Sequence, residues 1–141
     1  MGINIEQLEL CNSIKKTISE LMAQTKSISQ PLLNDLALVE PIHAEIRAEL
    51  AGVSRSIANR VELIVMLYLF SPMLIVSRKK EKNGAFRAIA KAMNTNASNL
   101  SKYKATILTY YKNYKDFREL ANATYENILQ KIAENSFIEN Q

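Results

Sequence analysis

The sequence predicts an all-α protein, a multi-helix bundle, from its turn residues, its apolar periodicity and its length. Only three Gly and three Pro occur among 141 residues, which is too few for the many tight turns of a sandwich or barrel. Apolar residues recur instead at steps of three and four along most of the chain, the period of one helix face. A chain of this length buries roughly 70% of its unfolded surface, so it needs no disulfide or metal to fold.

The first predicted helix covers residues 5–28. Its spacing also suits a short coiled-coil seam, so we expect a dimer or other homo-oligomer to form through this helix. Cys11 lies on the apolar stripe and is expected to be a small core residue, because free cysteine is among the most buried residue types. The stripe consists of Leu8, Cys11, Ile14, Ile18, Leu21, Thr25 and Ile28.

The middle of the chain predicts two more helices around a break at Gly52. The earlier helix opens at Pro41 and places His43 in its first turn, where we expect a surface histidine. The later helix, residues 54–70, is almost wholly apolar from Leu63 onward and is therefore the expected central buried helix. The apolar stretch ends at residue 76 and contains Ser-Pro, so it falls short of the ~20 residues of a membrane span. We expect no membrane partner.

Charge is distributed unevenly along the chain. Between residues 78 and 118 there are eleven basic and two acidic residues, whereas the rest of the chain has seven basic and twelve acidic ones. Such segregation is the electrostatic footprint of a segment that binds a polyanion. The alternative is a basic face that pairs with the acidic remainder of the fold.

This pattern divides the chain into three regions. Residues 1–76 are the N-terminal helical region, with helices for oligomerisation and for the core. Residues 77–135 are a basic region that packs on it as one compact unit, with a loop at 77–84 and helices at 85–93, 97–113 and 116–134. Residues 136–141 are a loose tail.

Residues 86–103 read FRAIAKAMNTNASNLSKY and resemble a helix-turn-helix of the repressor type. Asn94 stands at the turn, where a left-handed backbone is needed and Asn is the next choice after Gly. Thr95 or Asn96 caps the second helix. The apolar positions of the motif are filled by the pair Ile89-Ala90, the closing residue Met93 and the inward residue Leu100.

The resemblance implies that the second helix enters the major groove of duplex DNA. Helical phase puts Leu100, Tyr103 and Ile107 on the inward face, and we expect the tyrosines on this face, Tyr114 included, to be core residues. Asn99 would pair with adenine and Lys102 would reach guanine or phosphate, while basic residues on the preceding helix and loop contact phosphates. The predicted DNA-binding residues are Lys79, Lys80, Arg87, Lys91, Asn96, Ser98, Asn99, Lys102 and Thr106.

A second segment, AELAGVSRSIANRV at 48–61, is similar to a helix-turn-helix of the lactose-repressor type. The match weakens because Arg47 stands where that family buries an aliphatic residue and Ala58 where it usually has Val or Ile. The local charge is nearly balanced. We interpret the segment as an ordinary bend between helices, but which of the two segments contacts DNA, if either, stays open.

The sequence thus predicts a small cytoplasmic DNA-binding protein, a transcriptional regulator of the phage or mobile-element type. The alternative is a non-enzymatic helical adaptor or assembly protein. One Cys and one His cannot form a structural zinc site, and glycines at 2, 52 and 84 cannot build a phosphate-cradling loop. We expect neither an enzyme nor a cofactor. The opening MGINIEQLEL has no basic segment before an apolar one, so we expect no secretory signal.

Overall fold

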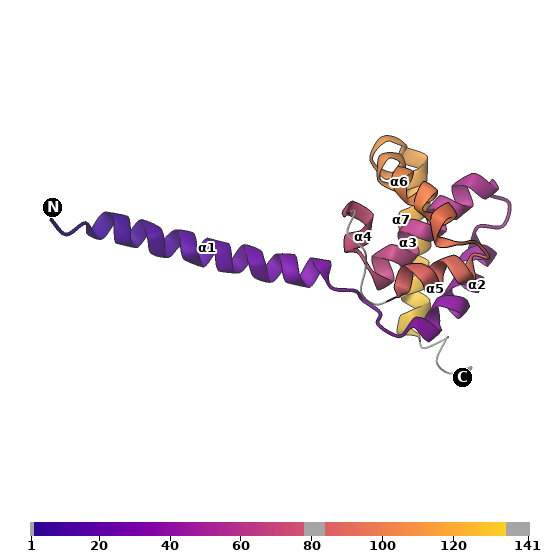
Figure 1. The fold of residues 1–141 in the computed structure, drawn as a ribbon, viewed down its shortest axis with the longest axis horizontal. Coiled ribbons are helices and arrows are strands. Elements are labelled where there is room, and N and C mark those ends of the chain that lie inside the picture. Colours follow the sequence, from indigo (N-terminus) through magenta and orange to yellow (C-terminus); the bar gives the residue numbers. More distant parts are fainter. Residues whose placement is uncertain (1, 78–83, 135–141) are drawn as a thin grey trace. The chain divides into compact units, whose positions relative to one another are not determined.

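The computed structural model describes residues 2–77 and 84–134 and confirms the all-α multi-helix fold (Figure 1). The described residues contain helices and no strand. The chain divides into two units, Met1–Gln30 and Pro31–Gln141, whereas the sequence analysis placed its boundary between residues 76 and 77. The helices are α1 (Ile5–Ser29), α2 (Val39–Glu49), α3 (Arg55–Phe70), α4 (Met73–Val76), α5 (Ala85–Ala92), α6 (Ala97–Asn113) and α7 (Lys115–Ala133), with a 3-10 turn at Leu36–Leu38.

The first unit consists of α1. Asn4 caps this helix, since its side-chain oxygen accepts a hydrogen bond of 3.0 Å from the backbone N–H of Gln7. The apolar side chains from Leu8 to Met22 are exposed. Cys11 is exposed too, so the expectation of a buried core cysteine is wrong. A single helix has no second element in its own unit to cover its stripe.

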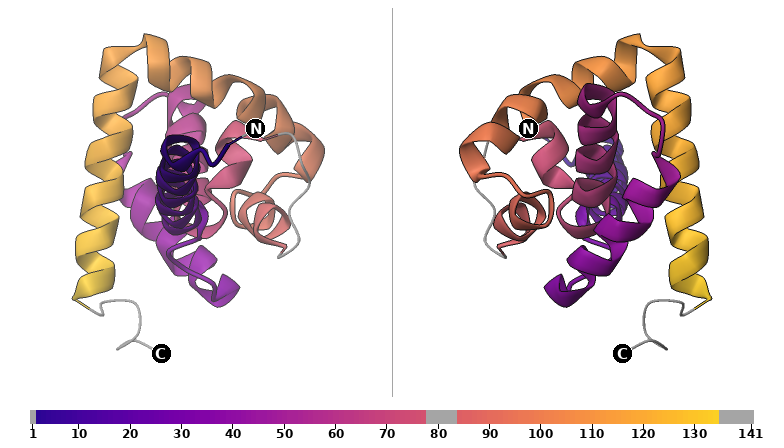
Figure 2. Two further views of the ribbon diagram at one scale, coloured as in Figure 1. Left: turned by 90° about the vertical axis from the view of Figure 1, so that its left-hand side faces the viewer. Right: turned by 90° about the vertical axis from the view of Figure 1, so that its right-hand side faces the viewer.

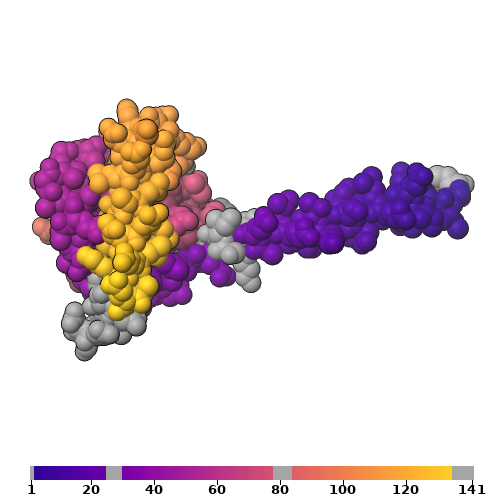
Figure 3. All heavy atoms as spheres, turned by 180° about the vertical axis from the view of Figure 1, so that it is seen from behind, coloured from indigo at the N-terminus to yellow at the C-terminus, as the bar shows by residue number. Residues whose placement is uncertain are grey.

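The second unit is built around α3, which packs against α2, α5, α6 and α7. Every residue from Val61 to Leu67 is buried, which confirms the predicted central helix. Around it, α6 lies across one end of the unit and α7 runs down one side (Figure 2). The outer surface of α7 occupies much of the face seen in Figure 3. The basic helices therefore pack directly onto the apolar core helix.

The ends of the later helices agree with the sequence analysis to within one residue. Ser71 and Pro72 separate α3 from α4 as expected, and Gly84, with φ of 76°, precedes α5. The corner between α6 and α7 is held by Arg118, whose Nη1 donates to the carbonyl oxygens of Tyr111 and Lys112 at 3.2 and 3.3 Å. The predicted tail, 136–141, lies outside the described residues. No helix in the described ranges is both long and apolar enough to cross a membrane.

Candidate functional site

The turn between α5 and α6 contains a left-handed residue and a hydrogen-bonded helix end. Asn94 has φ of 57° and is the single non-glycine residue with positive φ among those described. Its N–H donates to the carbonyl of Lys91 at 3.0 Å, and the N–H of Thr95 donates to that of Ala90 at 2.9 Å. This pair of bonds is a Schellman motif, which satisfies carbonyls at the end of a helix. The left-handed turn predicted at Asn94 is confirmed.

Asn96 caps the second helix of the motif. Its side-chain oxygen accepts a hydrogen bond of 2.8 Å from the backbone N–H of Asn99. Of the two candidate caps, Thr95 and Asn96, the second fills the role. Asn96 was also predicted to contact DNA. Its oxygen already accepts the capping bond, and its amide nitrogen can donate to a ligand.

The predicted division of faces is present along the first half of α6. Leu100 and Ile107 are fully buried, while Ser98, Asn99 and Lys102 are exposed. On α5, Ile89 is buried and two predicted residues, Arg87 and Lys91, are exposed. Within the described part of the chain, no ion pair or side-chain hydrogen bond is recorded for these five exposed residues, so their polar groups are available to a ligand.

Thr106 is placed differently from expectation. It is half-buried, and its hydroxyl accepts a 2.9 Å bond from Arg60 Nε and donates to the carbonyl of Tyr103 at 3.0 Å. The Arg60 guanidinium also lies over the rings of Tyr103 and Tyr110, 5.1 and 4.5 Å from their centroids. Thr106 therefore helps to join α6 to α3. The predicted contacts Lys79 and Lys80 lie outside the described residues.

Three of the basic residues in the described part of the chain interact with neighbouring groups. Lys104 Nζ donates to the carbonyl of Ser77 at 2.9 Å, Lys115 pairs with Glu119, and Arg118 holds the α6–α7 corner. These three cations serve local contacts. Tyr114 at that corner is 55% exposed and is not the core residue expected, because α6 ends there.

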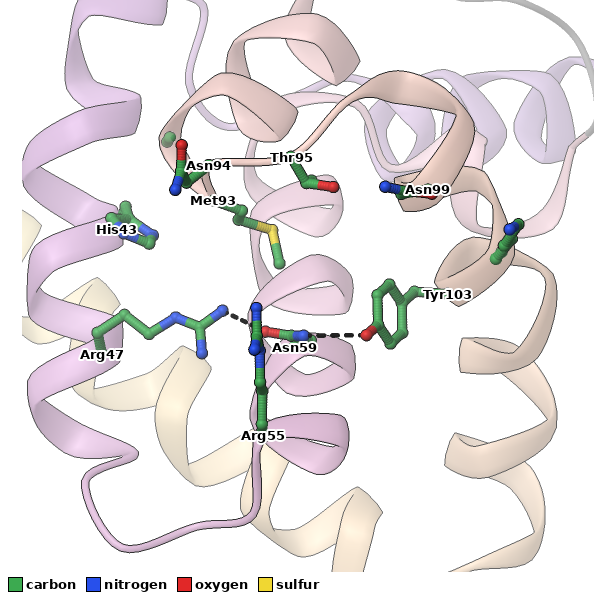
Figure 4. A pocket seen from close by; sticks show the side chains of 11 residues that line it. His43, Arg47, Arg55, Asn59, Met93, Asn94, Thr95, Asn99 and Tyr103 are labelled. Atoms are coloured by element: carbon green, nitrogen blue, oxygen red, sulfur yellow. Dashed lines mark hydrogen bonds between the residues drawn. The ribbon is translucent and has the colours of Figure 1, made fainter.

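A pocket of about 560 Å³ lies beside the turn and joins the two helix-turn-helix-like segments. Figure 4 shows its walls: His43 and Arg47 on α2, Asn59 on α3, and Tyr103 on α6. The turn residues Met93, Asn94 and Thr95 cover one end, with Asn99 next to them. Arg55 extends from the first turn of α3 toward the middle of the pocket. Lys102 and Ala92 complete the lining.

A buried carboxylate organises the base of this pocket. Glu62 is 0% exposed, and its two oxygens accept hydrogen bonds from Arg47 Nε at 2.7 Å and His43 Nδ1 at 2.5 Å. His43 is therefore not the surface histidine we expected: it is half-buried and bound to Glu62. The sequence pattern did not lead us to predict this cluster. A single charged residue within the apolar run 61–67 could have indicated it, because a buried charge requires partners.

Hydrogen bonds continue from this cluster across the pocket. Arg47 Nη2 donates to Asn59 Oδ1 at 2.6 Å, and Asn59 Nδ2 donates to the Tyr103 hydroxyl at 3.1 Å. The dashed lines of Figure 4 trace this chain from α2 through α3 to α6. It fixes the position of α6 relative to the central helix.

A second hollow, of about 520 Å³, lies on the other side of the turn. Arg87, Lys91 and Asn96 line it, and it shares Asn94, Thr95 and Asn99 with the first pocket. The start of α6 is thus flanked by cationic side chains on both sides.

Comparison with protein-family models, with curated proteins and with solved structures found no match.

Proposed function

We propose that this protein binds duplex DNA with α6 as its recognition helix and acts in the cytoplasm as a small transcriptional regulator of the phage or mobile-element type. The observation that carries the proposal is the start of α6, where exposed polar residues lie between two cationic hollows. A major groove about 12 Å wide admits a helix and has a phosphate strand on each side. The exposed polar residues at the start of α6, with cationic side chains on both sides, match that surface.

The exposed residues divide into two roles. Asn99 and Lys102 project from the first two turns of α6, where a recognition helix reaches base edges; Asn favours adenine, and Lys favours guanine or phosphate. Arg87 and Lys91 lie on α5 beside the second hollow and act on phosphates, which fix the register of the complex without reading sequence.

The earlier segment is poorly suited to read bases. Its second helix is α3, whose residues 61–67 are all buried, so apart from Tyr68 its exposed residues lie in its first turn. That turn carries Arg55, which lines the same pocket as Lys102. The two segments therefore support one surface, and α6 is the element we assign to the groove.

The test is a titration of the protein against mixed-sequence duplex, followed by fluorescence anisotropy at two salt concentrations. Affinity should fall steeply with salt. The double variant Asn99→Ala/Lys102→Glu should weaken binding by about tenfold or more. Lys112→Glu is the matched control, because it reverses the same charge at an exposed position near the other end of α6. Binding by the unmodified protein no tighter than that of a neutral protein would refute the proposal.

We further propose that α1 forms a homodimer, as paired half-sites require. Cys11, Ile14, Ile18 and Leu21 follow alternating steps of three and four, the spacing of a coiled-coil seam. Because Cys11 is the single cysteine of the chain, a parallel, in-register pair places two thiols face to face. Oxidised glutathione should then join them, the two thiols giving one disulfide as the oxidant is reduced, and a covalent dimer should form on a non-reducing gel.

Cys11→Ser should abolish this product but leave the dimer intact in sedimentation equilibrium. A monomer at micromolar concentration would contradict the α1 dimer. The exposed α1 stripe also supports the second candidate, a helical assembly protein without a DNA role. Stable self-association together with indifference to duplex in the anisotropy assay would favour that candidate.

A further inference from the structure

We infer that the pocket between α2, α3 and α6 binds a phosphate group, and that Arg55 and Lys102 are its direct ligands. The phosphate belongs either to a DNA strand, in which case the inference rests on the function proposed above, or to a free phosphorylated compound, in which case it does not. The inference assigns a role to Arg55, which the DNA-binding residues named from the sequence did not include.

The lining of the pocket carries an excess of positive charge. Arg47, Arg55 and Lys102 bring three positive charges to its lining, and no carboxylate of the described residues lines it. Glu62, the acidic partner of Arg47, is wholly buried and is also bound to His43. For Arg55 and Lys102, no ion pair is recorded with any residue in 2–77 and 84–134. Two cations that share one hollow without an anion repel each other, and a bound phosphate removes that repulsion.

The pocket is also lined by several hydrogen-bond donors. A guanidinium presents its N–H groups as a fork that fits two oxygens of a phosphate, and an ammonium adds three more donors. The amide of Asn99 and the hydroxyl of Thr95 lie on the same lining. The lining therefore offers donors in excess, which suits a group whose free oxygens only accept hydrogen bonds.

Hydrogen bonds between side chains hold the walls of the pocket together. Arg47 is fixed by Glu62 and by Asn59, and Asn59 is fixed in turn by Tyr103. This chain holds the three helices that carry the cations in one arrangement before any ligand arrives. A preorganised site avoids part of the entropy cost of binding.

The volume of the pocket suits a ligand larger than phosphate alone. About 560 Å³ is more than a bare phosphate fills and lies within the range of about 300–1,000 Å³ typical of ligand sites. Ala92, Met93 and Tyr103 supply apolar and aromatic surface beside the cations. The pocket thus suits a phosphate attached to an organic group, such as the sugar of a nucleotide unit.

The experiment has two arms, each using the full chain and three single variants. One arm measures pyrophosphate binding by isothermal titration calorimetry, with acetate as the control anion. The other measures duplex affinity by anisotropy across a salt series. The variants are Arg55→Gln, Lys102→Gln and the control Lys112→Gln, which removes an exposed cation outside the pocket. Because all three residues are exposed, unchanged thermal unfolding should show that each variant is folded.

Arg55→Gln and Lys102→Gln should each weaken phosphate binding by about tenfold, whereas Lys112→Gln should not. In the duplex arm, Arg55→Gln should also lower the slope of log affinity against log salt by about one. A loss confined to the duplex arm identifies a backbone phosphate as the occupant. A loss confined to the pyrophosphate arm identifies a free phosphate compound, even if the unmodified protein does not bind duplex. Equal binding by all variants in both arms, or binding of neither probe, overturns the inference.

Discussion

The two helix-turn-helix-like segments of this protein share a local design and differ in their surroundings. Both bend at a residue with left-handed backbone, Gly52 at φ 87° and Asn94 at φ 57°. Their second helices differ: α3 has seven consecutive buried residues at 61–67, whereas α6 fully buries Leu100 and Ile107 alone. The comparison teaches that a motif read from the sequence specifies a bend, and that the packing around the bend decides whether a helix face is left for a ligand.

The largest expected effect tests whether the earlier segment is structural. Arg47→Met removes one of the two partners of the buried Glu62 and should lower the free energy of unfolding by about 3 kcal/mol, because a buried charge loses compensation. Urea denaturation measures the change. The control Arg87→Met, on exposed α5 surface, should stay within about 0.5 kcal/mol. Equal stabilities for the two variants would refute a structural role for the Glu62 cluster.

The next largest effect on stability concerns the two turns, at Gly52 and at Asn94. A Cβ on Gly52 meets nothing within 4 Å, so Gly52→Ala should cost only the left-handed backbone penalty, about 1–2 kcal/mol. Asn94→Ala should cost about 1 kcal/mol for the same reason, and Asn94→Gly should be close to neutral. Urea denaturation gives these values. Of the two alanine variants, only Asn94→Ala should also weaken duplex binding, since that turn orients α6; a similar loss of affinity for Gly52→Ala would break the comparison.

A smaller effect concerns the bond that joins the segments. Tyr103→Phe removes the acceptor of the 3.1 Å hydrogen bond from Asn59 and should cost about 1 kcal/mol. The double variant Asn59→Ala/Tyr103→Phe should cost less than the sum of the two single variants, because they lose the same bond. Full additivity in urea denaturation would show that the two segments are not coupled through this bond.

The smallest effect on stability concerns the ion pair that joins α2, the first helix of the earlier segment, to α7. The hydrogen bond from Lys131 to the Glu45 carboxylate raises the pKa of Lys131 above its ordinary value. A raised folded-state pKa gives stability that is complete below about pH 10.5 and is lost as the pH rises through the folded-state pKa. Both side chains are more than a third exposed, so Lys131→Met should cost only about 0.5 kcal/mol at pH 7.

That difference between Lys131→Met and the unmodified protein should shrink in urea titrations as the pH rises above about 10.5 and through the folded-state pKa of Lys131. Lys115→Met, which removes a more exposed pair with Glu119, is the control and should have a smaller effect at both pH values. A difference that persists unchanged at alkaline pH would show that Lys131 acts through packing instead of charge.

Much of the fold was predictable because it depends on local pattern. The step of three and four located the helices, and the apolar run after Leu63 marked α3 as central. The candidate site was only partly predictable. The exposed positions of Arg87, Lys91 and Lys102 followed from helical phase, but the engagement of Thr106 by Arg60 did not, because that bond joins residues 46 positions apart.

The sequence by itself determined the helices, the two bends and the segregation of charge, since each depends on neighbours along the chain. Only the tertiary structure decided that both segments line one pocket. It also decided that His43 and Arg47 bind the buried Glu62, and that some basic residues, such as Lys104, form local contacts. The physical reason is that burial and ion pairing are set by residues brought together from distant positions. A helical pattern fixes which face is apolar, but not what packs against that face.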